Sequence, residues 1–516
     1  MTRAEMYRRL RAHSGTWDMI VAGGGATGVG VAIDAASRGY DVLLLEQHDF
    51  GKGTSSRSTK LVHGGVRYLE QGNVSLVMEA LKERGLLARN APHLVRNLGF
   101  VVPNYDWWEA PFYGIGLKLY NLLAGKYGFG ASRILSREET LERLPTIKPE
   151  GLRGGVIYFD GQFDDSRLLI NLVATAFEQG ATLLNYAPVS ELTRDSEGFV
   201  DGVRFHDAET GEELEARARV VINATGPFAD ALRRKADPTV QPMIAPSQGI
   251  HLVFDRSFLA GDDAIMVPHT SDGRVMFAIP WHGHTVVGTT DTPIAEASLE
   301  PAALAQEIEF ILQTSALYLA KTPARDDIRS VFAGIRPLVK SGEGGNTAAL
   351  SRDHTIRIEN SGLVTVCGGK WTTYRHMAED CVNQAATLAR LPDRPCVTEH
   401  LNIHGFHSSS EKFGRLWMYG SDAPLVERTA EEGEPLDADL PYTAAEVLWA
   451  VREEMARTLE DVLARRTRAL FLNSQAALRM APRVVRLMAE ELKRDARWEA
   501  AQVENFRATA RNYLPL

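Results

Sequence analysis

Residues 20–46 open with Ile-Val-Ala-Gly-Gly-Gly-Ala-Thr-Gly-Val-Gly and close with Asp-Val-Leu-Leu-Leu-Glu. An apolar strand leads into Gly23, Gly25 and Gly28, and this G-x-G-x-x-G spacing lets the backbone approach a pyrophosphate at a helix N-terminus. The second strand ends at Glu46, where a carboxylate suits a free ribose hydroxyl. Because strand, helix, second strand and acidic end occur in register, the stretch predicts a dinucleotide-binding βαβ unit.

The overall composition limits the class of protein. A chain of 516 residues is too long for one core and should split into two or three domains. The formal net charge of −9 argues against a general nucleic-acid binder, so an anionic substrate must be met by a local basic pocket. Three cysteines without a C-x-x-C spacing indicate neither a disulfide framework nor a zinc knuckle, and they favour a reducing, cytoplasmic setting.

Two kinds of membrane segment are not expected. The arginine-rich N-terminus passes directly to Asp18 and the first strand, without the apolar core of a signal peptide. No window reaches the roughly 18 consecutive apolar residues that a spanning helix needs. One stretch fits equally well as a membrane-resting surface and as core packing. It comprises Trp107, Trp108, Phe112, Tyr113, Leu117, Tyr120, Leu122 and Leu123, with Lys118 and Lys126.

Hydrophobic periodicity predicts further elements along the chain. The Gly-, Ser- and Thr-rich residues 51–71 suggest a long loop that serves a site. Helices are expected at 75–89 and from 163–167 onward, a strand pair at 199–205 and 213–222, and short β-like runs at 250–254, 275–279 and 285–288. A strand, turn and helix are expected at 363–375, and a charged helical cap is expected near the C-terminus, with helices at 447–452, 459–468 and 484–493.

The motifs together resemble one family. Residues 54–70 read Thr-Ser-Ser-Arg-Ser-Thr-Lys-Leu-Val-His-Gly-Gly-Val-Arg-Tyr-Leu-Glu, and this run is more specific than the glycine turns. With residues 23–28, 223–227, 288–291, 334–338 and 368–375, it resembles the FAD-dependent glycerol-3-phosphate dehydrogenases. The resemblance covers most of the chain but is loose past about Pro392, so the role of the C-terminal region is left open.

The resemblance implies a fold, a reaction and partners. The fold class is α/β, with a Rossmann-like FAD-binding domain, a β-sheet substrate domain of the D-amino-acid-oxidase type and a C-terminal helical cap. We predict a discontinuous FAD-binding domain at 15–80, 160–235 and 351–390, a substrate-binding domain at 81–159 and 236–350, and a helical domain at 391–516. In this family sn-glycerol 3-phosphate is oxidised to dihydroxyacetone phosphate, and the reduced flavin passes electrons to membrane quinone or, in an oxidase subgroup, to dioxygen. The expected localisation is therefore cytoplasmic, with peripheral contact at the cytoplasmic face of the membrane.

Alcohol oxidation needs an electron sink, a base and positive groups that hold phosphate and developing alkoxide. The matched motifs and the residues beside them supply candidates. The predicted substrate-binding residues are Arg67, Tyr68, His251, Arg336, Arg352 and Lys370, of which His251, Arg336 and Lys370 are also predicted to be catalytic. The predicted FAD-binding residues are Gly23, Gly25, Gly28, Glu46, Thr54, Ser55, Ser58, Thr59, His63, Gly64, Gly65, Ala224, Thr225, Gly226, Gly369, Lys370, Trp371 and Thr372.

Several alternatives remain open from the sequence. The base is His251, His63 or a pocket water, and His63 either touches the flavin or satisfies backbone in a tight loop. The His282 and His284 pair lacks an acidic or cysteine partner at metal-ligand spacing, so no metal is expected. Quinone is favoured over dioxygen because residues 338–368 show no inserted segment of the oxidase kind.

Two other functions compete with the dehydrogenase. One is a flavin oxidase of an amino acid or hydroxy acid, which would need an arginine for the substrate carboxylate but not several converging cations. The other is a carrier protein that grips a lipidated partner without redox chemistry. The charged C-terminal helices either pair with a second subunit, in a homodimer, or face solvent.

Overall fold

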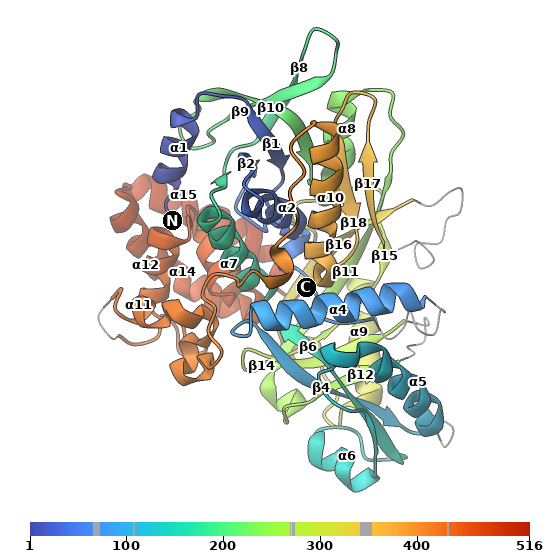
Figure 1. Cartoon of the computed structure of the whole chain (residues 1–516). Coiled ribbons are helices and arrows are strands. Elements are labelled where there is room, and N and C mark those ends of the chain that lie inside the picture. The colour runs from blue at the N-terminus through green and yellow to red at the C-terminus, as the bar shows by residue number, and fades with distance from the viewer. Residues whose placement is uncertain are drawn as a thin grey trace.

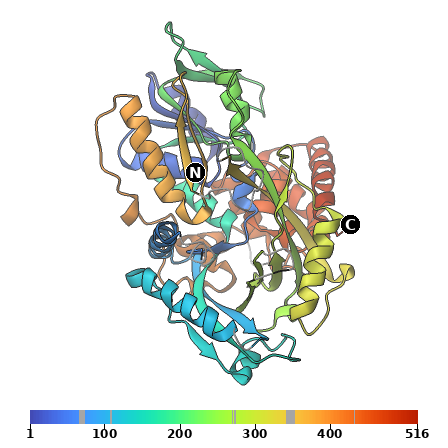
Figure 2. The same ribbon diagram turned by 90° about the vertical axis from the view of Figure 1, so that its right-hand side faces the viewer.

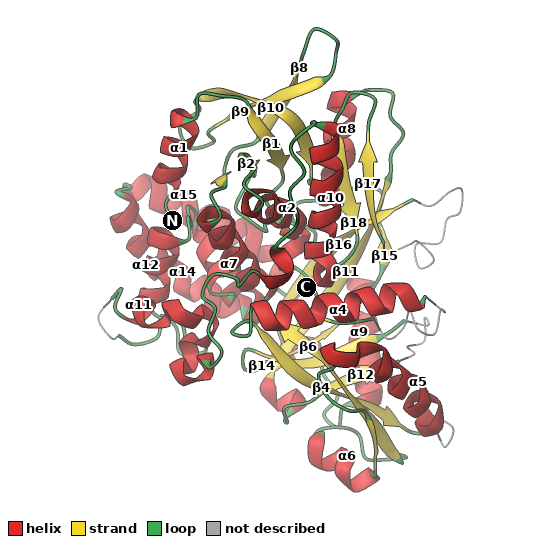
Figure 3. Ribbon diagram, viewed as in Figure 1, coloured by secondary structure: helices red, strands yellow, loops and turns green. Residues whose placement is uncertain are grey.

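The computed structural model describes residues 1–65, 73–106, 109–268, 270, 274–340, 353–430 and 433–515, without the side chains of 109–112. Some predicted residues lie outside this description: Arg67, Tyr68 and Arg352, and in the apolar stretch Trp107, Trp108 and the Phe112 side chain. How the chain divides into domains stays a prediction. The strands nevertheless fall into two sheets, which Figures 1 and 3 show one above the other.

The first sheet carries the dinucleotide motif. Its main path runs β17-β18-β10-β1-β2-β7, and β8 and β9 extend it as an antiparallel pair from β10. β1 pairs in parallel with both β2 and β10, as a βαβ unit requires. The strands are β1 (Trp17–Ala22), β2 (Val42–Leu45), β7 (Thr182–Leu184), β8 (Val189–Arg194), β9 (Val200–His206), β10 (Glu213–Asn223), β17 (His354–Ile358) and β18 (Val364–Gly368).

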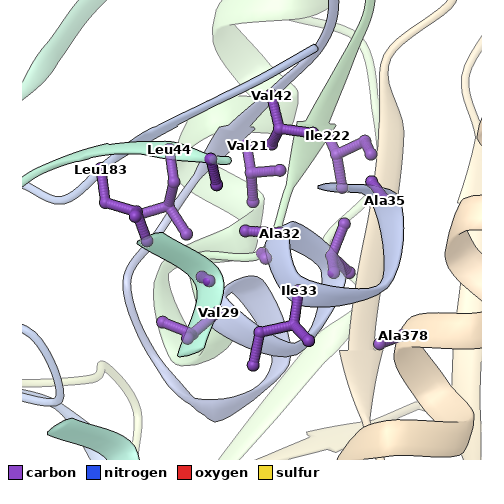
Figure 4. Close-up of a cluster of buried hydrophobic side chains, with 14 of the residues drawn as sticks. Val21, Val29, Ala32, Ile33, Ala35, Val42, Leu44, Leu183, Ile222 and Ala378 are labelled. Carbon is purple, nitrogen blue, oxygen red and sulfur yellow. The ribbon is translucent and has the colours of Figure 1, made fainter. Parts of the chain in front are cut away.

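Small residues let α2 (Ala26–Ser37) lie close to the first sheet and to α10 (Tyr374–Leu388). Figure 4 shows the apolar side chains of α2 against those of β1, β2, β7 and β10, with Ala378 of α10 beside them. A Cβ on Gly28 would lie 1.9 Å from the Gly23 carbonyl oxygen, and one on Gly30 would lie 2.9 Å from Tyr374 Cδ2. The third glycine of the motif is therefore a packing requirement of the turn.

The second sheet lies below the first in Figure 1 and runs β15-β11-β14-β13-β12-β4-β6-β3, with β16 on β11 and β5 on β6. Its two long strands β11 and β16 pair antiparallel, and they bring His251 opposite Phe332 and Ser247 opposite Arg336. The strands are β3 (Leu61–Val62), β4 (Val95–Asn104), β5 (Arg133–Leu135), β6 (Gly154–Phe163), β11 (Ile244–Asp255), β12 (Ala264–Val267), β13 (Met276–Trp281), β14 (His284–Gly288), β15 (Thr292–Pro293) and β16 (Ile328–Val339).

The remaining helices lie around the two sheets (Figures 1 and 2). The C-terminal helices gather beside α1 and α7 in Figure 1. None of the described helices has the length and apolarity that crossing a bilayer requires. The helices are α1 (Arg3–Ala12), α4 (Val74–Asn90), α5 (Glu109–Ala124), α6 (Arg137–Arg143), α7 (Asp165–Glu178), α8 (Ala229–Ala236), α9 (Ala305–Tyr318), α11 (Ala423–Glu427), α12 (Ala444–Glu453), α13 (Ala469–Leu472), α14 (Ser474–Leu492) and α15 (Ala496–Ala510).

Most of the expected elements are present, and two points are refined by the structure. The helix expected at 459–468 is present over 459–466, but its turn at Asp461–Arg466 is π-helical, and α13 follows it. The apolar stretch of α5 does not form one exposed face, because Tyr113, Leu117 and Tyr120 pack into the core while Leu122 is 77% exposed. An apolar periodicity identifies the helix, but it does not say which of the apolar side chains meet the core.

The close approach at Gly28 makes a testable prediction. Gly28→Ala should destabilise the protein by more than about 2 kcal/mol, because the backbone oxygen of Gly23 cannot move aside as a flexible side chain would. Denaturant unfolding would measure this loss. The control is Gly116→Ala in α5, where an added Cβ meets nothing within 4 Å and should be neutral or stabilising. Equal stability of the two variants would contradict the packing argument.

Candidate active site

One cavity, of about 300 Å³, opens at the carboxyl ends of β1 and β2. This is where ligands bind in open α/β sheets. It brings together eleven of the predicted cofactor residues from five separate segments of the chain. These are Gly23, Gly25, Glu46, Thr54, Ser55, Ala224, Thr225, Gly226, Gly369, Lys370 and Trp371.

The N-terminus of α2 opens into this cavity. Its N-cap residue, Gly25, makes no side-chain capping bond, and Gly25, Ala26 and Thr27 all line the cavity. The Ala26 N–H donates to Ser55 Oγ at 2.9 Å, which ties the loop after β2 to the helix start. Backbone N–H groups and the helix dipole favour an anion here, so the turn fits the pyrophosphate of a dinucleotide.

Glu46 lines the cavity, as the sequence predicts, but its carboxylate also has a structural task. It accepts the Gly24 N–H at 2.6 Å and the His48 N–H at 2.9 Å. Burial raises the pKa of Glu46, and the two backbone donors work in the opposite direction. Glu46 therefore fixes the turn as well as presenting a carboxylate at the ribose end of the site.

The turn after β18 forms the opposite wall. Lys370 and Trp371 line the cavity, and the indole Nε1–H donates to the Ser55 carbonyl at 2.8 Å. Thr372 lies just outside the lining and exchanges hydrogen bonds with the backbone of His63, accepting its N–H at 3.2 Å. Two glycine-rich turns, distant in sequence, are thus joined through the loop at 54–63.

Seven predicted cofactor residues do not line this cavity. Gly28 lies beneath the turn, where its missing Cβ admits the Gly23 carbonyl. Gly64 donates its N–H to the Tyr120 hydroxyl at 2.9 Å, and Ser58 donates both its N–H and its hydroxyl to Asp165. The others are Thr59, His63, Gly65 and Thr372.

His251 lies in the second sheet, just beyond the loop. It is 3% exposed, its ring stacks on Phe332 with 4.7 Å between centroids, and its Nε2 is hydrogen-bonded to Thr59 Oγ1 at 3.0 Å. Burial, and then the charges of Lys60 and Arg336, lower the pKa of His251 well below 6.5. The imidazole is therefore neutral at physiological pH, and among the described residues its Nδ1 has no hydrogen-bond partner.

Lys60 belongs to this site, although the sequence analysis did not assign it a role. It is fully buried, and its Nζ donates to Asp165 Oδ2 at 2.6 Å and to the Ser56 carbonyl at 2.9 Å. The ammonium also lies 4.9 Å from the centroid of the Phe332 ring, against which His251 stacks. Burial lowers the pKa of Lys60 from 10.5 to about 7, although the Asp165 carboxylate works in the other direction.

Arg336 reaches the same region from β16. Its guanidinium donates to the Thr290 carbonyl at 2.9 Å and to Thr289 Oγ1 at 3.2 Å, and it pairs with Asp291 at 3.2 Å. The side chain is 24% exposed and does not line the cofactor cavity. A substrate phosphate would meet a guanidinium that a carboxylate and a carbonyl already orient.

The structure also shows the hydrogen-bond partners of His282 and His284. His282 Nε2 lies 2.9 Å from Asp164 Oδ2, a partner that sequence spacing did not suggest, and His284 Nδ1 lies 2.9 Å from the His282 carbonyl. Within the described ranges, no group of three or more potential ligand side chains has the arrangement of a metal site.

Comparison with known proteins identifies the family. The sequence matches the profile of the FAD dependent oxidoreductases over residues 18–379. It is 41% identical to the mitochondrial glycerol-3-phosphate dehydrogenase SDP6 of Arabidopsis thaliana, in an alignment that covers 96% of this chain and 86% of that protein. The chain belongs to the family of FAD-dependent glycerol-3-phosphate dehydrogenases. A probable mitochondrial glycerol-3-phosphate dehydrogenase of Caenorhabditis elegans is 40% identical, over 95% of this chain and 73% of its own length.

Two further matches cover the rest of the molecule. The solved glycerol-3-phosphate dehydrogenase of Bacillus halodurans, complexed with FAD, has a TM-score of 0.81 and 30% identity, and the alignment covers 100% of this chain and 99% of that one. Residues 367–500 match the C-terminal domain of alpha-glycerophosphate oxidase, so the family resemblance extends well beyond Pro392. This glycerol-3-phosphate dehydrogenase family member is accordingly an FAD-dependent oxidoreductase, and the glycine turns and open helix N-terminus described above fit that cofactor.

The buried ammonium of Lys60 predicts how stability depends on pH. Between about pH 7 and pH 10.5 the unfolded chain binds a proton that folded Lys60 has released, so this group makes stability rise with pH in that window. Lys60→Met should abolish that contribution. Thermal midpoints of both proteins from about pH 7 to pH 10 should therefore diverge in favour of the wild type.

The control for this prediction is Lys118→Met, because Lys118 is exposed on α5 and should leave the slope unchanged. Parallel curves for the wild type and Lys60→Met would show that Lys60 keeps an ordinary pKa in the folded protein.

Proposed function

We propose that this chain oxidises sn-glycerol 3-phosphate at C2 to dihydroxyacetone phosphate and passes the electrons to membrane quinone. FAD, when bound, accepts the hydride. The observation that carries the proposal is the concentration of buried and half-buried cations beside the cofactor cavity, in a protein of net charge −9 whose relatives are named glycerol-3-phosphate dehydrogenases. Such a site favours an anionic substrate.

The charges of the site suit a phosphate ester. The charges of Lys60 and Arg336 both lower the pKa of His251, and Lys370 lies on the neighbouring cavity wall. A phosphate dianion placed among these groups would raise the pKa of His251 and Lys60, because an opposite charge favours the protonated form of each. The neutral imidazole would then become a better acceptor for the C2 hydroxyl proton as the substrate binds. This favours His251 as the base.

An oxidase of amino acids or hydroxy acids is not favoured. Its substrate carboxylate would need one arginine, whereas this site places Lys60 and Arg336 around one histidine. The solved structures of amino-acid oxidases that resemble this chain, such as the glycine oxidase of Geobacillus kaustophilus at 20% identity, share the fold alone.

The substrate is tested by anaerobic flavin bleaching. Glycerol 3-phosphate should bleach the flavin absorption of the purified protein, because hydride transfer reduces FAD, whereas glycerol and lactate should not. Arg336→Ala should raise the concentration needed for half-maximal bleaching by about tenfold or more, since a charge-assisted bond contributes roughly 1.5–3 kcal/mol. Bleaching by glycerol or lactate as strong as that by the phosphate ester would reject the proposed substrate.

Quinone remains the proposed acceptor, on the absence of an oxidase-type insertion in residues 338–368. In the test, the bleached enzyme is mixed with a soluble quinone or with dissolved dioxygen, and the rate at which the flavin is reoxidised is measured. Fast reoxidation by quinone and slow peroxide formation support the proposal, and the reverse order would assign the chain to the oxidase subgroup.

We also propose that the protein rests on the cytoplasmic face of a membrane through an apolar face of α5. Ile115, Leu119 and Leu122 follow helical spacing, and all three are exposed, Ile115 by 72% and Leu122 by 77%. Met78 of the adjoining α4 is 52% exposed, and Lys118 is exposed on α5. Apolar side chains flanked by lysines favour an anionic lipid surface.

This surface predicts binding to lipid vesicles. The double variant Ile115→Glu and Leu122→Glu should lose most of its co-sedimentation with phosphatidylglycerol-containing vesicles, because two exposed apolar side chains that would enter the lipid boundary become charged. Leu425→Glu is the matched control, because the Leu425 side chain on α11 is also exposed, and this variant should sediment as the wild type does. Unchanged binding of the double variant would remove α5 from the membrane surface. The molar mass in solution, measured on the same preparations, decides between a homodimer and a monomer.

A further inference from the structure

The segment that follows Glu46 forms one wall of the cofactor cavity, and we call residues 46–57 the cofactor loop. Glu46, Gln47 and residues 51–55 line the cavity. The loop contains only one short helical turn, Thr54–Ser56, so its own secondary structure does little to define its shape. What holds this wall in place therefore decides how well the cavity fits its ligand.

The back of the cofactor loop is held by the C-terminal helical region. Asp49 is fully buried, and it accepts hydrogen bonds from Arg465 Nε at 2.5 Å and from the two terminal nitrogens of Arg466, Nη1 at 2.7 Å and Nη2 at 2.9 Å. The two guanidiniums lower the pKa of Asp49 despite its burial. Arg466 Nη2 also donates to the Glu454 carbonyl at 2.8 Å, which anchors this pair within the helical region.

Contacts of Lys52 and Arg468 also hold the cofactor loop. Lys52 lines the cavity, and its Nζ pairs with Glu460 at 2.5 Å and with Glu300 at 2.7 Å. Arg468 Nη2 donates to the Ser56 carbonyl at 2.8 Å and to Asp165 Oδ1 at 3.1 Å. Glu460, Arg465, Arg466 and Arg468, which hold the back of the loop, therefore come from one short stretch, 460–468, which contains the π-helical turn, and Glu300 adds a contact from outside it.

We propose that Arg465, Arg466 and Arg468 are positioning residues for FAD, and that the C-terminal helical region serves to hold the cofactor loop in the shape that binds it. None of these side chains lines the cavity, so their effect passes through Asp49 and the Ser56 backbone. The inference rests on the FAD dependence of the family, and it does not depend on the identity of the substrate or the electron acceptor.

Population arithmetic gives the size of the effect. If losing one guanidinium leaves the cofactor loop correctly shaped in only about a tenth of the molecules, the apparent Kd for FAD rises about tenfold. We expect the change at Arg466 to disturb the position of Asp49 more than the stability of the whole fold. Arg465 still pairs with Asp49, Glu460 and Asp461 when Arg466 is changed.

The experiment measures FAD affinity separately from stability. Apoprotein of Arg466→Met is titrated with FAD by flavin fluorescence, and amide exchange of residues 46–57 is followed in the same protein. We expect the Kd for FAD to rise about tenfold or more and exchange in the cofactor loop to accelerate, with Arg466→Lys lying between the variant and the wild type. FAD dissociation from the holoprotein should accelerate correspondingly.

The matched control is Arg38→Met. Arg38 is also a buried arginine on a carboxylate, with its Nη2 2.5 Å from Asp34, but it lies at the C-terminal end of α2, away from the cavity. This variant should lower the thermal midpoint while the Kd for FAD stays within about twofold. Arg466→Met that loses stability but keeps the wild-type Kd and loop exchange would overturn the proposal.

A second variant covers the case in which Arg466→Met does not fold. Glu460→Gln removes one of the two carboxylates that hold Lys52 at the cavity wall, and it leaves both arginines on Asp49. It should weaken FAD binding severalfold. If FAD affinity and loop exchange in Glu460→Gln both equal those of the wild type, the helical region does not position the cofactor loop. Because flavin titration uses no substrate, this outcome is distinct from a failure of the proposed dehydrogenase reaction.

Discussion

The architecture depends on one steric constraint, the contact between the first and last glycines of the turn after β1. Gly23 has a φ of +112°, and its carbonyl oxygen occupies the space that a Cβ on Gly28 would fill. This contact brings α2 close to the sheet, and the small side chains of α2 let it pack against β1, β2 and α10. The N-terminus of α2, the Glu46 carboxylate and the second glycine-rich turn all line the same cavity.

Around that turn, the molecule separates cofactor binding from the handling of the substrate charge. The first sheet supplies backbone N–H groups and small residues, whereas the second supplies His251 and Arg336 on two paired strands. Lys60 lies between them, with its ammonium on Asp165 and its neighbour Thr59 on the histidine. Lys60 and Arg336 are each oriented by a carboxylate, Asp165 and Asp291, so the basic groups are held beside the neutral imidazole of His251, where a phosphate ester suits them.

The sequence predicts the cofactor end of the site better than the substrate end, for a physical reason. The glycine turn is local, so its spacing alone implies its geometry, and eleven predicted residues indeed line one cavity. Lys60 was missed because its partner Asp165 lies 105 residues away, and no spacing rule connects them. The π-helical turn at Asp461–Arg466 was expected to be α-helical, since apolar periodicity does not distinguish the two. Arg67, Tyr68 and Arg352 lie outside the described residues and stay predictions.

The arginines behind the cofactor loop have a consequence for how the protein is made. Asp49 and Arg465 are separated by 416 residues of sequence, so the buried aspartate emerges from the ribosome long before its partners are synthesised. Contacts of such large separation slow folding, because a long loop must close before they form. Asp49 can therefore be buried beside its arginine partners only after the C-terminal helical region has been synthesised.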